Sequence, residues 1–195
     1  MILSVDLGQS NDYTAVSVIE PIGDLFKVIH LERYPLGMSY PDQVERISQL
    51  YGKISSPSLV VDRTGVGRAV TDLLNGLRPI ALTITSGNEA TKDGKIWNIP
   101  KRDLIHNLVV LFQSGKIKIA RSLPVADVLI KELLNFKLKV NIATGHDSYE
   151  AWREGVHDDL VLSVAMGAYV AKGEVRGAQP TLEMAAGYSS LTLPI

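Results

Sequence analysis

The stretch ILSVDLG, from Ile2 to Gly8, decides the fold that the sequence predicts. A short apolar run that ends abruptly at a glycine is typical of a buried strand followed by a turn. Because side chains alternate across a strand, Ser4 and Asp6 share one face, and the leucines and the valine take the other. Asp6 is therefore expected at the carboxyl end of the first strand.

The stretch SLVVDRTGVG, from Ser58 to Gly67, repeats this pattern later in the chain. Asp62 stands at the carboxyl end of a second predicted strand, directly before a turn with two glycines. Glycine in such a turn lets another backbone come close. In open α/β sheets, ligands bind beyond the carboxyl ends of parallel strands, so Asp6 and Asp62 are predicted to face one crevice.

A third acidic segment, GVHDDLV from Gly155 to Val161, opens a predicted helix over Asp158 to Lys172. Apolar residues recur there at helical spacing, and the two acids stand where they suit the helix macrodipole. Adjacent residues lie about 100° apart around a helix, so Asp158 and Asp159 are not equivalent. We expect one of them to bind metal, while the other caps the helix, binds a second metal or orients a water molecule.

Each of these acidic segments also has an ordinary structural explanation. An aspartate at a strand end is usually a turn residue, and an acidic pair at a helix start is usually a cap. The three segments come from distant parts of the chain, yet they predict one shared location. We therefore favour a carboxylate cluster that holds divalent metal.

Length and composition predict one sizeable core, because the chain has 195 residues of which 46% are hydrophobic. No apolar run approaches roughly eighteen residues and no basic segment precedes the first strand, so neither a membrane span nor a signal peptide is expected. The sequence predicts a soluble, intracellular protein without membrane partners. The absence of cysteine excludes thiolate ligands and favours magnesium or manganese over structural zinc.

The formal net charge of −1 hides a basic middle segment. Between Thr91 and Arg121, seven basic residues stand against two acids, a local net charge of +5. A positive segment beside acidic metal ligands suits a protein that binds a phosphate backbone, although lysines that flank helices and strands are usually only solvated. The residues expected to contact DNA are Lys92, Lys95, Lys101 and Arg102.

Hydrophobic periodicity predicts the remaining elements. Further strands are expected at Thr14 to Glu20, Leu25 to Tyr34, Pro79 to Thr85 and Lys116 to Ala120, and helices at Pro41 to Ile54, Gly67 to Asn75, Pro100 to Ser114 and Val125 to Leu134. The polar stretch Gly87 to Asn98 is predicted to be a mobile loop. A hairpin is predicted from Asn135 to Asn141 and Asp147 to Trp152.

Three antiparallel strands followed by helix, parallel strand, helix and parallel strand is the element order of the ribonuclease H fold. The expected class is α/β, with a central mixed sheet flanked by helices. We expect one domain over residues 1–172 and a loosely ordered tail over residues 173–195, which is rich in glycine and small polar residues.

On these segments the chain resembles the nuclease domain of the large terminase subunit of tailed bacteriophages, within the ribonuclease H and RuvC resolvase superfamily. The resemblance covers nearly all of Met1 to Lys172 and depends on VDLG, VVDRTGVGRAV, IPKRDLI and above all GVHDDLVLSVAMG. It implies that the metal ligands are Asp6, Asp62, Asp158 and Asp159.

The mechanism that follows is two-metal hydrolysis of phosphodiester bonds in double-stranded DNA. Asp6 would bridge two Mg²⁺ or Mn²⁺ ions about 3.5 to 4 Å apart, with the other aspartates completing the two sites. Lys101 and Arg102 would bind the scissile or an adjacent phosphate. His157 either assists proton transfer or is a hydrogen-bonding spacer beside the helix.

Large terminases resemble two-part machines with an ATPase motor, but no GxxxxGK[ST] loop occurs in this sequence. The sequence therefore predicts a separately expressed nuclease domain. The resemblance implies as partners the terminase ATPase domain, the small terminase subunit and the portal, and it implies action during viral genome packaging in the cytoplasm of the infected bacterial host.

The acidic segments are also compatible with three other kinds of protein. An actin-like or sugar-kinase ATPase needs two duplicated lobes, for which the chain is too short. A RuvC-like junction resolvase would prefer four-way junctions to plain duplex. A ribonuclease H-like module without catalytic activity would bind only DNA or the portal.

Overall fold

The structure is a computed structural model that describes residues 1–8, 12–65, 67–142 and 157–173. The predicted strand over 147–152 and nearly all of the predicted tail over 173–195 lie outside the described residues. The domain boundary at residue 172 therefore stays a prediction. None of the helices in the described ranges is long and apolar enough to cross a membrane.

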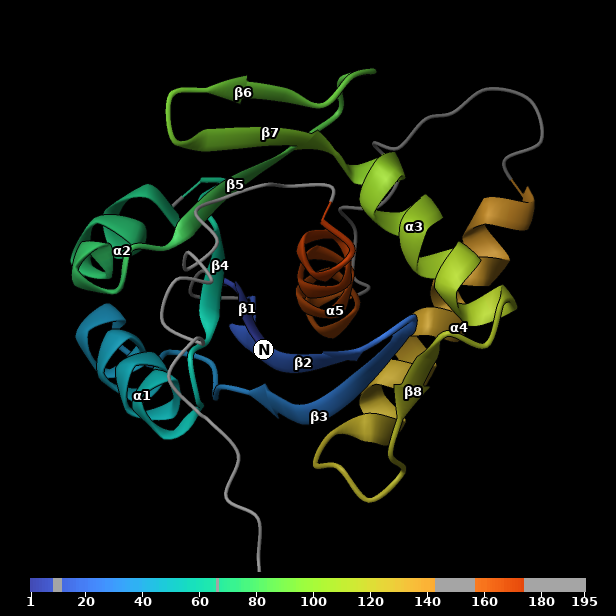
Figure 1. Cartoon of the computed structure of the whole chain (residues 1–195), viewed down its shortest axis with the longest axis horizontal. Helices are drawn as coiled ribbons and strands as arrows, with labels where there is room; N and C mark the ends of the chain where they lie inside the picture. The colour runs from blue at the N-terminus through green and yellow to red at the C-terminus, as the bar shows by residue number, and fades with distance from the viewer. Residues whose placement is uncertain (9–11, 66, 143–156, 174–195) are drawn as a thin grey trace, which may run out of the picture.

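Within the described residues, eight strands form one mixed sheet in the order β6-β7-β5-β4-β1-β2-β3-β8 (Figure 1). The strands are β1 (Ile2–Asp6), β2 (Ala15–Ile22), β3 (Leu25–Arg33), β4 (Ser58–Asp62), β5 (Ile80–Thr85), β6 (Thr91–Asp93), β7 (Ile96–Pro100) and β8 (Ile117–Ile119). The first three strands are antiparallel, whereas β4, β5 and β7 run parallel to β1 and to one another. The predicted mixed sheet is confirmed.

Helices cover both faces of this sheet. They are α1 (Tyr40–Lys53), α2 (Gly67–Leu73), the short 3-10 helix η1 (Asn75–Leu77), α3 (Lys101–Gln113), α4 (Ala126–Ile142) and α5 (Asp159–Ala171). Figure 1 shows α1 and α2 on one side of the sheet and α5 on the other, with α3 beside α5. The two faces bury separate cores, so the sheet is the middle layer of the domain.

The first strand separates the two cores because its side chains alternate. Leu3 and Val5 pack in one core with Ile47 of α1 and Val70 of α2. Ser4 points to the other face, where its Cβ lies beneath α5. Asp6, two residues further on, shares the face of Ser4, as the sequence predicted.

The helix α5 packs unusually close to β1 and β2. Ser163 Oγ makes hydrogen bonds to the Ser4 carbonyl oxygen at 3.1 Å and to the Ser17 hydroxyl at 2.9 Å. One turn later a Cβ on Gly167 would lie only 2.8 Å from Ile19 Cδ1 and 3.0 Å from Ser4 Cβ. These contacts fix both the height of α5 above the sheet and its rotation, and so they fix where its N-terminus lies.

The prediction of a mobile loop at Gly87 to Asn98 is wrong. This stretch contains a β-hairpin, β6 and β7, which pair antiparallel on either side of Gly94. The turn needs a backbone with positive φ, and Gly94 adopts a φ of +57° there. The stretch is polar because it forms an exposed hairpin at the edge of the sheet, and only its second strand, β7, is partly buried.

The strand predicted at Asn135 to Asn141 is also wrong, because the helix α4 continues through it to Ile142. The sequence LNFKLKVNI alternates apolar and polar residues, which is the pattern of a half-buried strand. Leucine and lysine are good helix formers, and a helix already begun at Ala126 extends at little cost. The rest of the predicted hairpin lies outside the described residues.

The close approach at Gly167 predicts a large difference between two helical glycines. Gly167→Ala is expected to lower the free energy of unfolding by about 1 to 3 kcal/mol, because the new methyl group would push α5 away from Ser4 and Ile19. Gly52→Ala in α1 meets no atom within 4 Å and should be neutral or stabilising by up to about 1 kcal/mol. Urea denaturation measures both, and equal effects would contradict this packing.

Candidate metal centre

Asp6 and Asp62 end two adjacent parallel strands. The register pairs Val5 of β1 with Val61 of β4, so the aspartate that follows each valine lies at the same edge of the sheet. Both residues are buried, with 8% and 7% of their surface exposed. The structure therefore places two acidic side chains in a site that is largely shielded from water.

Asp62 is held by a residue that the sequence analysis treated only as part of a turn. The backbone N–H and the hydroxyl of Thr64 both donate to Asp62 Oδ1, at 2.8 and 2.6 Å. The Thr64 hydroxyl in turn accepts from the Ile84 N–H at 3.0 Å. An Asp side chain at a turn often accepts from the N–H two residues further on, so the backbone bond from Thr64 follows a local rule, whereas the hydroxyl bond does not.

The two aspartates of the HDD segment lie at the start of α5 and have different surroundings. Asp159 is 8% exposed, and its Oδ2 has no hydrogen-bond donor among the described residues. His157 Nδ1 lies 3.7 Å from that oxygen, which is too far for a hydrogen bond. Asp158 is more exposed and turns toward a lysine. The predicted difference between the two residues is thus present in the geometry.

That lysine is Lys101, the first residue of α3. Its Nζ lies 2.7 Å from Asp158 Oδ2. The strand β7 runs parallel to β5, so its carboxyl end reaches the same edge as the ends of β1 and β4. The sequence predicts a phosphate contact for Lys101 but a loop in place of most of β7, and so it does not predict the pairing of Lys101 with Asp158.

Burial and mutual repulsion raise the pKa of several of these carboxyl groups. The pKa of Asp6 is raised well above its ordinary value by burial first and then by Asp62, Asp159 and Asp158, while Lys101 opposes the shift. Burial also raises the pKa of Asp62, against the hydrogen bonds from Thr64. The pKa of Asp159 rises to about 6, again chiefly through burial. The four aspartates therefore interact electrostatically at one place.

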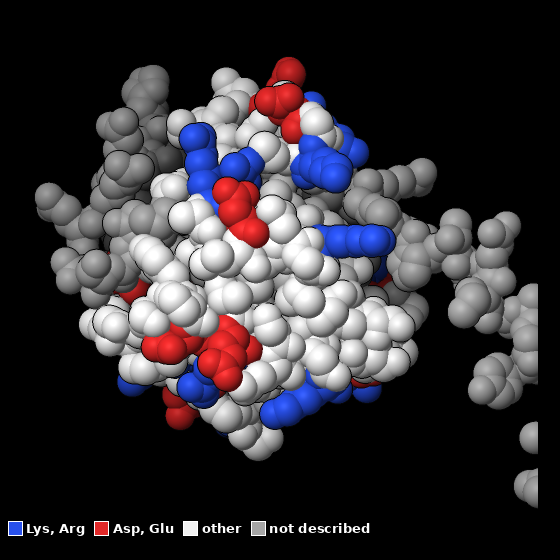
Figure 2. All heavy atoms as spheres, turned by 90° about the vertical axis from the view of Figure 1, so that its left-hand side faces the viewer, with Lys and Arg blue, Asp and Glu red and all other residues white. Residues whose placement is uncertain are grey.

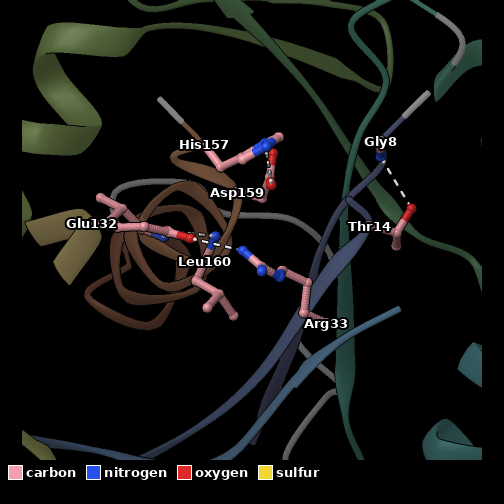
Figure 3. A network of polar contacts seen from close by, with 8 residues as sticks. Gly8, Thr14, Arg33, Glu132, His157, Asp159 and Leu160 are labelled. Atoms are coloured by element: carbon pink, nitrogen blue, oxygen red, sulfur yellow. Dashed lines mark hydrogen bonds and ion pairs between the residues drawn. The ribbon is translucent and has the colours of Figure 1, made fainter. Parts of the chain in front are cut away.

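A second layer of polar contacts lies behind α5 (Figure 3). Glu132 of α4 is 5% exposed, and its Oε2 accepts from the N–H groups of Leu160 at 3.1 Å and Val161 at 3.2 Å. Arg33 of β3 reaches its Oε1 at 3.5 Å. Burial raises the pKa of Glu132 to about 7. No sequence pattern marked Glu132, because a glutamate within a helix is ordinary and its partners are distant in the chain.

Arg33 links this layer to His157 through an aromatic ring. The guanidinium carbon of Arg33 lies 3.8 Å from the centre of the Tyr13 ring. The rings of Tyr13 and His157 meet edge to face, with centroids 5.0 Å apart and planes at 74°. His157 is thus oriented by an aromatic neighbour on one side and by Asp159 on the other.

The donor atoms suit a hard divalent cation. They are carboxylate oxygens, one of which is buried without a donor among the described residues, and burial raises the pKa of Asp6 and Asp159. Among the described residues, however, no group of three acidic or histidine side chains lies close enough to hold a metal ion. Asp62 and Asp158 are turned toward Thr64 and Lys101 instead. The assignment of metal ligands therefore stays a prediction.

The structure divides the basic segment between two edges of the sheet. Lys92 and Lys95 lie on the β6–β7 hairpin, with Lys92 Nζ 4.8 Å from the centre of the Trp97 ring. Lys118 lies on β8, at the opposite edge. Arg102 of α3 bonds Asn88 Oδ1 at 2.9 Å. Figure 2 shows basic and acidic side chains gathered along the upper and lower edges of one face, with a mainly uncharged surface between them.

The sequence matches a known family over most of its length. A sequence model described as the terminase RNase H-like domain matches residues 3–168. The chain belongs to this terminase family. Its relatives include large terminase subunits from Thermus virus P23-45 and Thermus phage G20c, each 29% identical over 166 residues. The matched segment is 84% of this chain but only 30% of the length of each of those two relatives.

Solved structures agree on the fold. The large terminase nuclease of thermophilic phage G20c superposes with a TM-score of 0.59 at 22% identity, and the comparison covers 87% of this chain and 80% of that one. The same nuclease with bound zinc gives 0.56 at 23%, over 87% and 79% of the two chains. The human cytomegalovirus terminase nuclease domain soaked with manganese gives 0.54 at 16%, over 87% and 82%. The predicted ribonuclease H-like fold and the predicted family are confirmed.

The raised pKa values predict that the metal-free terminase domain loses stability as pH rises. A carboxyl group whose pKa is higher in the folded chain than in the unfolded chain binds its proton more tightly when folded. Its stabilising contribution is complete below the unfolded pKa and disappears as pH rises through the folded pKa. For Asp159 this window runs from 3.8 to about 6, and for Glu132 from 4.5 to about 7.

Calorimetry in EDTA tests this expectation. The melting temperature should fall by about 5 °C between about pH 5 and pH 8. Glu132→Gln removes one of the titrating groups, so the fall should be smaller in that variant. A melting temperature that is constant or rises over this range would contradict the raised pKa values.

Proposed function

We propose that this chain is the nuclease domain of a phage large terminase and that it hydrolyses phosphodiester bonds of double-stranded DNA with divalent metal. The observation that supports the proposal is that Asp6, Asp62 and Asp159 are all buried with raised pKa values, and that Asp62 and Asp159 both act on Asp6. Membership of a terminase family supports the nuclease assignment. The zinc-bound and manganese-soaked relatives support the use of divalent metal.

In this proposal Asp6, Asp62 and one or both of Asp158 and Asp159 hold two Mg²⁺ or Mn²⁺ ions. Bound cations of this kind activate water and stabilise the charge that develops on the leaving oxygen. The protein itself supplies no nucleophile. Burial of the aspartates excludes competing water and strengthens their attraction to positive charge. Asp62, held by Thr64, is the most firmly oriented of the set.

Two basic groups have separate tasks. Lys101 compensates part of the negative charge of the cluster through Asp158, and a DNA phosphate that approached its Nζ would compete with that carboxylate. His157, whose side chain is 44% exposed and lies 3.7 Å from Asp159, is placed to move a proton between the site and solvent at Nδ1. Arg102 and the lysines of the β6–β7 hairpin extend the basic surface away from the acids.

The biological setting that we propose follows from the family. The domain would cut viral DNA during genome packaging in the cytoplasm of an infected bacterium. Its partners would be a terminase ATPase domain, a small terminase subunit and the portal. The curated relatives are about three times as long as the matched segment, which is consistent with a nuclease that works alongside further domains.

Plasmid cleavage tests the nuclease activity. Supercoiled plasmid incubated with the purified chain should be nicked and linearised with Mn²⁺ or Mg²⁺ and should remain intact in EDTA. Asp62→Ala should reduce the rate by at least about a hundredfold, because a metal ligand supplies several kcal/mol of transition-state stabilisation. Asp72→Ala, an exposed aspartate of α2, is the matched control and should cut like the unchanged chain.

Metal binding is checked separately by melting temperature. Millimolar Mn²⁺ should raise it in the unchanged chain by more than in Asp62→Ala. A rise without cutting would indicate a domain that needs its ATPase partner, whereas no rise and no cutting would overturn the proposal. A strong preference for four-way junctions over duplex would favour a RuvC-like resolvase instead.

The proposed DNA contacts are tested by neutralising one edge of the sheet at a time. The double variant Lys92→Gln/Lys95→Gln on the β6–β7 hairpin should weaken binding of a 30-base-pair duplex, with a salt dependence shallower by roughly 1 to 2 in log–log slope. Lys118→Gln/Arg121→Gln, at the β8 edge, removes the same charge and should change little. Fluorescence anisotropy in EDTA measures both, and equal losses would argue against a hairpin contact.

A further inference from the structure

The N-terminus of α5 is capped from another helix. An N-terminal cap usually comes from the residue just before the helix, whose side chain accepts from the second or third helical N–H. The helix α1 follows this rule, because Ser39 Oγ accepts from the Asp42 N–H at 3.3 Å. Asp158 is the corresponding residue of α5 and is a residue type that caps well, yet its side chain makes no cap hydrogen bond.

The two N–H groups that Asp158 leaves open are taken by Glu132. Leu160 and Val161 are the second and third residues of α5, and both donate to Glu132 Oε2, at 3.1 and 3.2 Å. Figure 3 shows Glu132 pointing from α4 at the end of α5. The same two donors cannot be satisfied by Asp158 while Glu132 holds them.

The backbone conformation of Asp158 also differs from that of a residue that caps its own helix. Ser39, the local cap of α1, has an extended backbone with ψ of 150°, whereas Asp158 has ψ of 17°. Its carboxylate lies instead 2.7 Å from Lys101 Nζ. The charge brought by Glu132 is itself compensated, because Arg33 lies 3.5 Å from its Oε1.

We infer that Glu132 is a positioning residue that caps α5 from α4 and thereby releases the carboxylate of Asp158 from capping, so that it can face Lys101 and the proposed metal-binding cluster. It touches neither metal nor DNA in this role. The inference rests on the proposed function only for what Asp158 does once released. The capping itself is a property of the metal-free protein.

The test uses the full 195-residue chain and two readouts. The first is amide hydrogen exchange of Leu160 and Val161 in EDTA, followed by NMR. The second is the dissociation constant for Mn²⁺, measured from the electron paramagnetic resonance of unbound Mn²⁺. The variants are Glu132→Ala, which removes the acceptor, and Glu132→Gln, which keeps one acceptor oxygen. Asp127→Ala, an exposed acid in the first turn of α4, is the matched control.

Glu132→Ala is expected to speed exchange of these two amides about tenfold and to weaken Mn²⁺ binding about tenfold. Glu132→Gln should stay within about threefold of the unchanged chain in both readouts, and Asp127→Ala should match it. Unchanged exchange in Glu132→Ala would overturn the cap. Faster exchange with unchanged Mn²⁺ affinity would overturn the release of Asp158.

Two further outcomes are decisive. If Glu132→Ala does not fold, Glu132→Gln carries the test, and a loss larger than about threefold would show that charge rather than the acceptor matters. If the unchanged chain binds no Mn²⁺, the proposed nuclease function fails, and with it the release of Asp158 to a metal cluster. The amide readout still decides whether Glu132 caps α5.

Discussion

The cost of burying negative charge governs the structure around the carboxyl edge of the sheet. Asp6, Asp62 and Asp159 are each no more than 8% exposed, and Asp62 and Asp159 raise the free energy of ionising Asp6. Burying a carboxylate without hydrogen-bond donors costs several kcal/mol. Several nearby residues supply such donors. Thr64 and Lys101 each hold one of the four aspartates. Asp159 Oδ2, buried without a donor among the described residues, is the oxygen most in need of a positive partner.

Sheet topology explains how residues so distant in sequence meet. The strands β1, β4 and β7 all point their carboxyl ends the same way, and each ends at or beside a residue of the proposed site: Asp6, Asp62 and Lys101. The fourth contribution comes from a helix whose position depends on small residues. Ser163 and Gly167 let α5 approach the sheet closely enough for its first turn to reach the strand ends. Small side chains at these two positions of α5 therefore help to set where Asp158 and Asp159 lie.

The sequence predicted the strand-end acids correctly because they depend on local rules. Alternation in β1 and β4 fixes the face of Asp6 and Asp62, and the mixed sheet follows from element order. Prediction from the sequence failed where tertiary contacts override the local pattern. The alternation of Asn135 to Asn141 suggests a strand, but the helix α4 continues there. Glu132 was missed because the two N–H groups that donate to it lie 28 and 29 residues away, on a helix that no local signal connects to it.

Charge counted along the chain also differs from charge in space. The basic segment from Thr91 to Arg121 carries a net +5, yet β8 and the β6–β7 hairpin lie at opposite edges of the sheet. Only the hairpin side adjoins the carboxylates, because β7 leads directly into Lys101. The basic residues that would attract a phosphate backbone therefore lie close to the carboxylates that would repel it. Lys101, bound to Asp158, stands at that boundary, where a phosphate and a carboxylate would compete for one ammonium group.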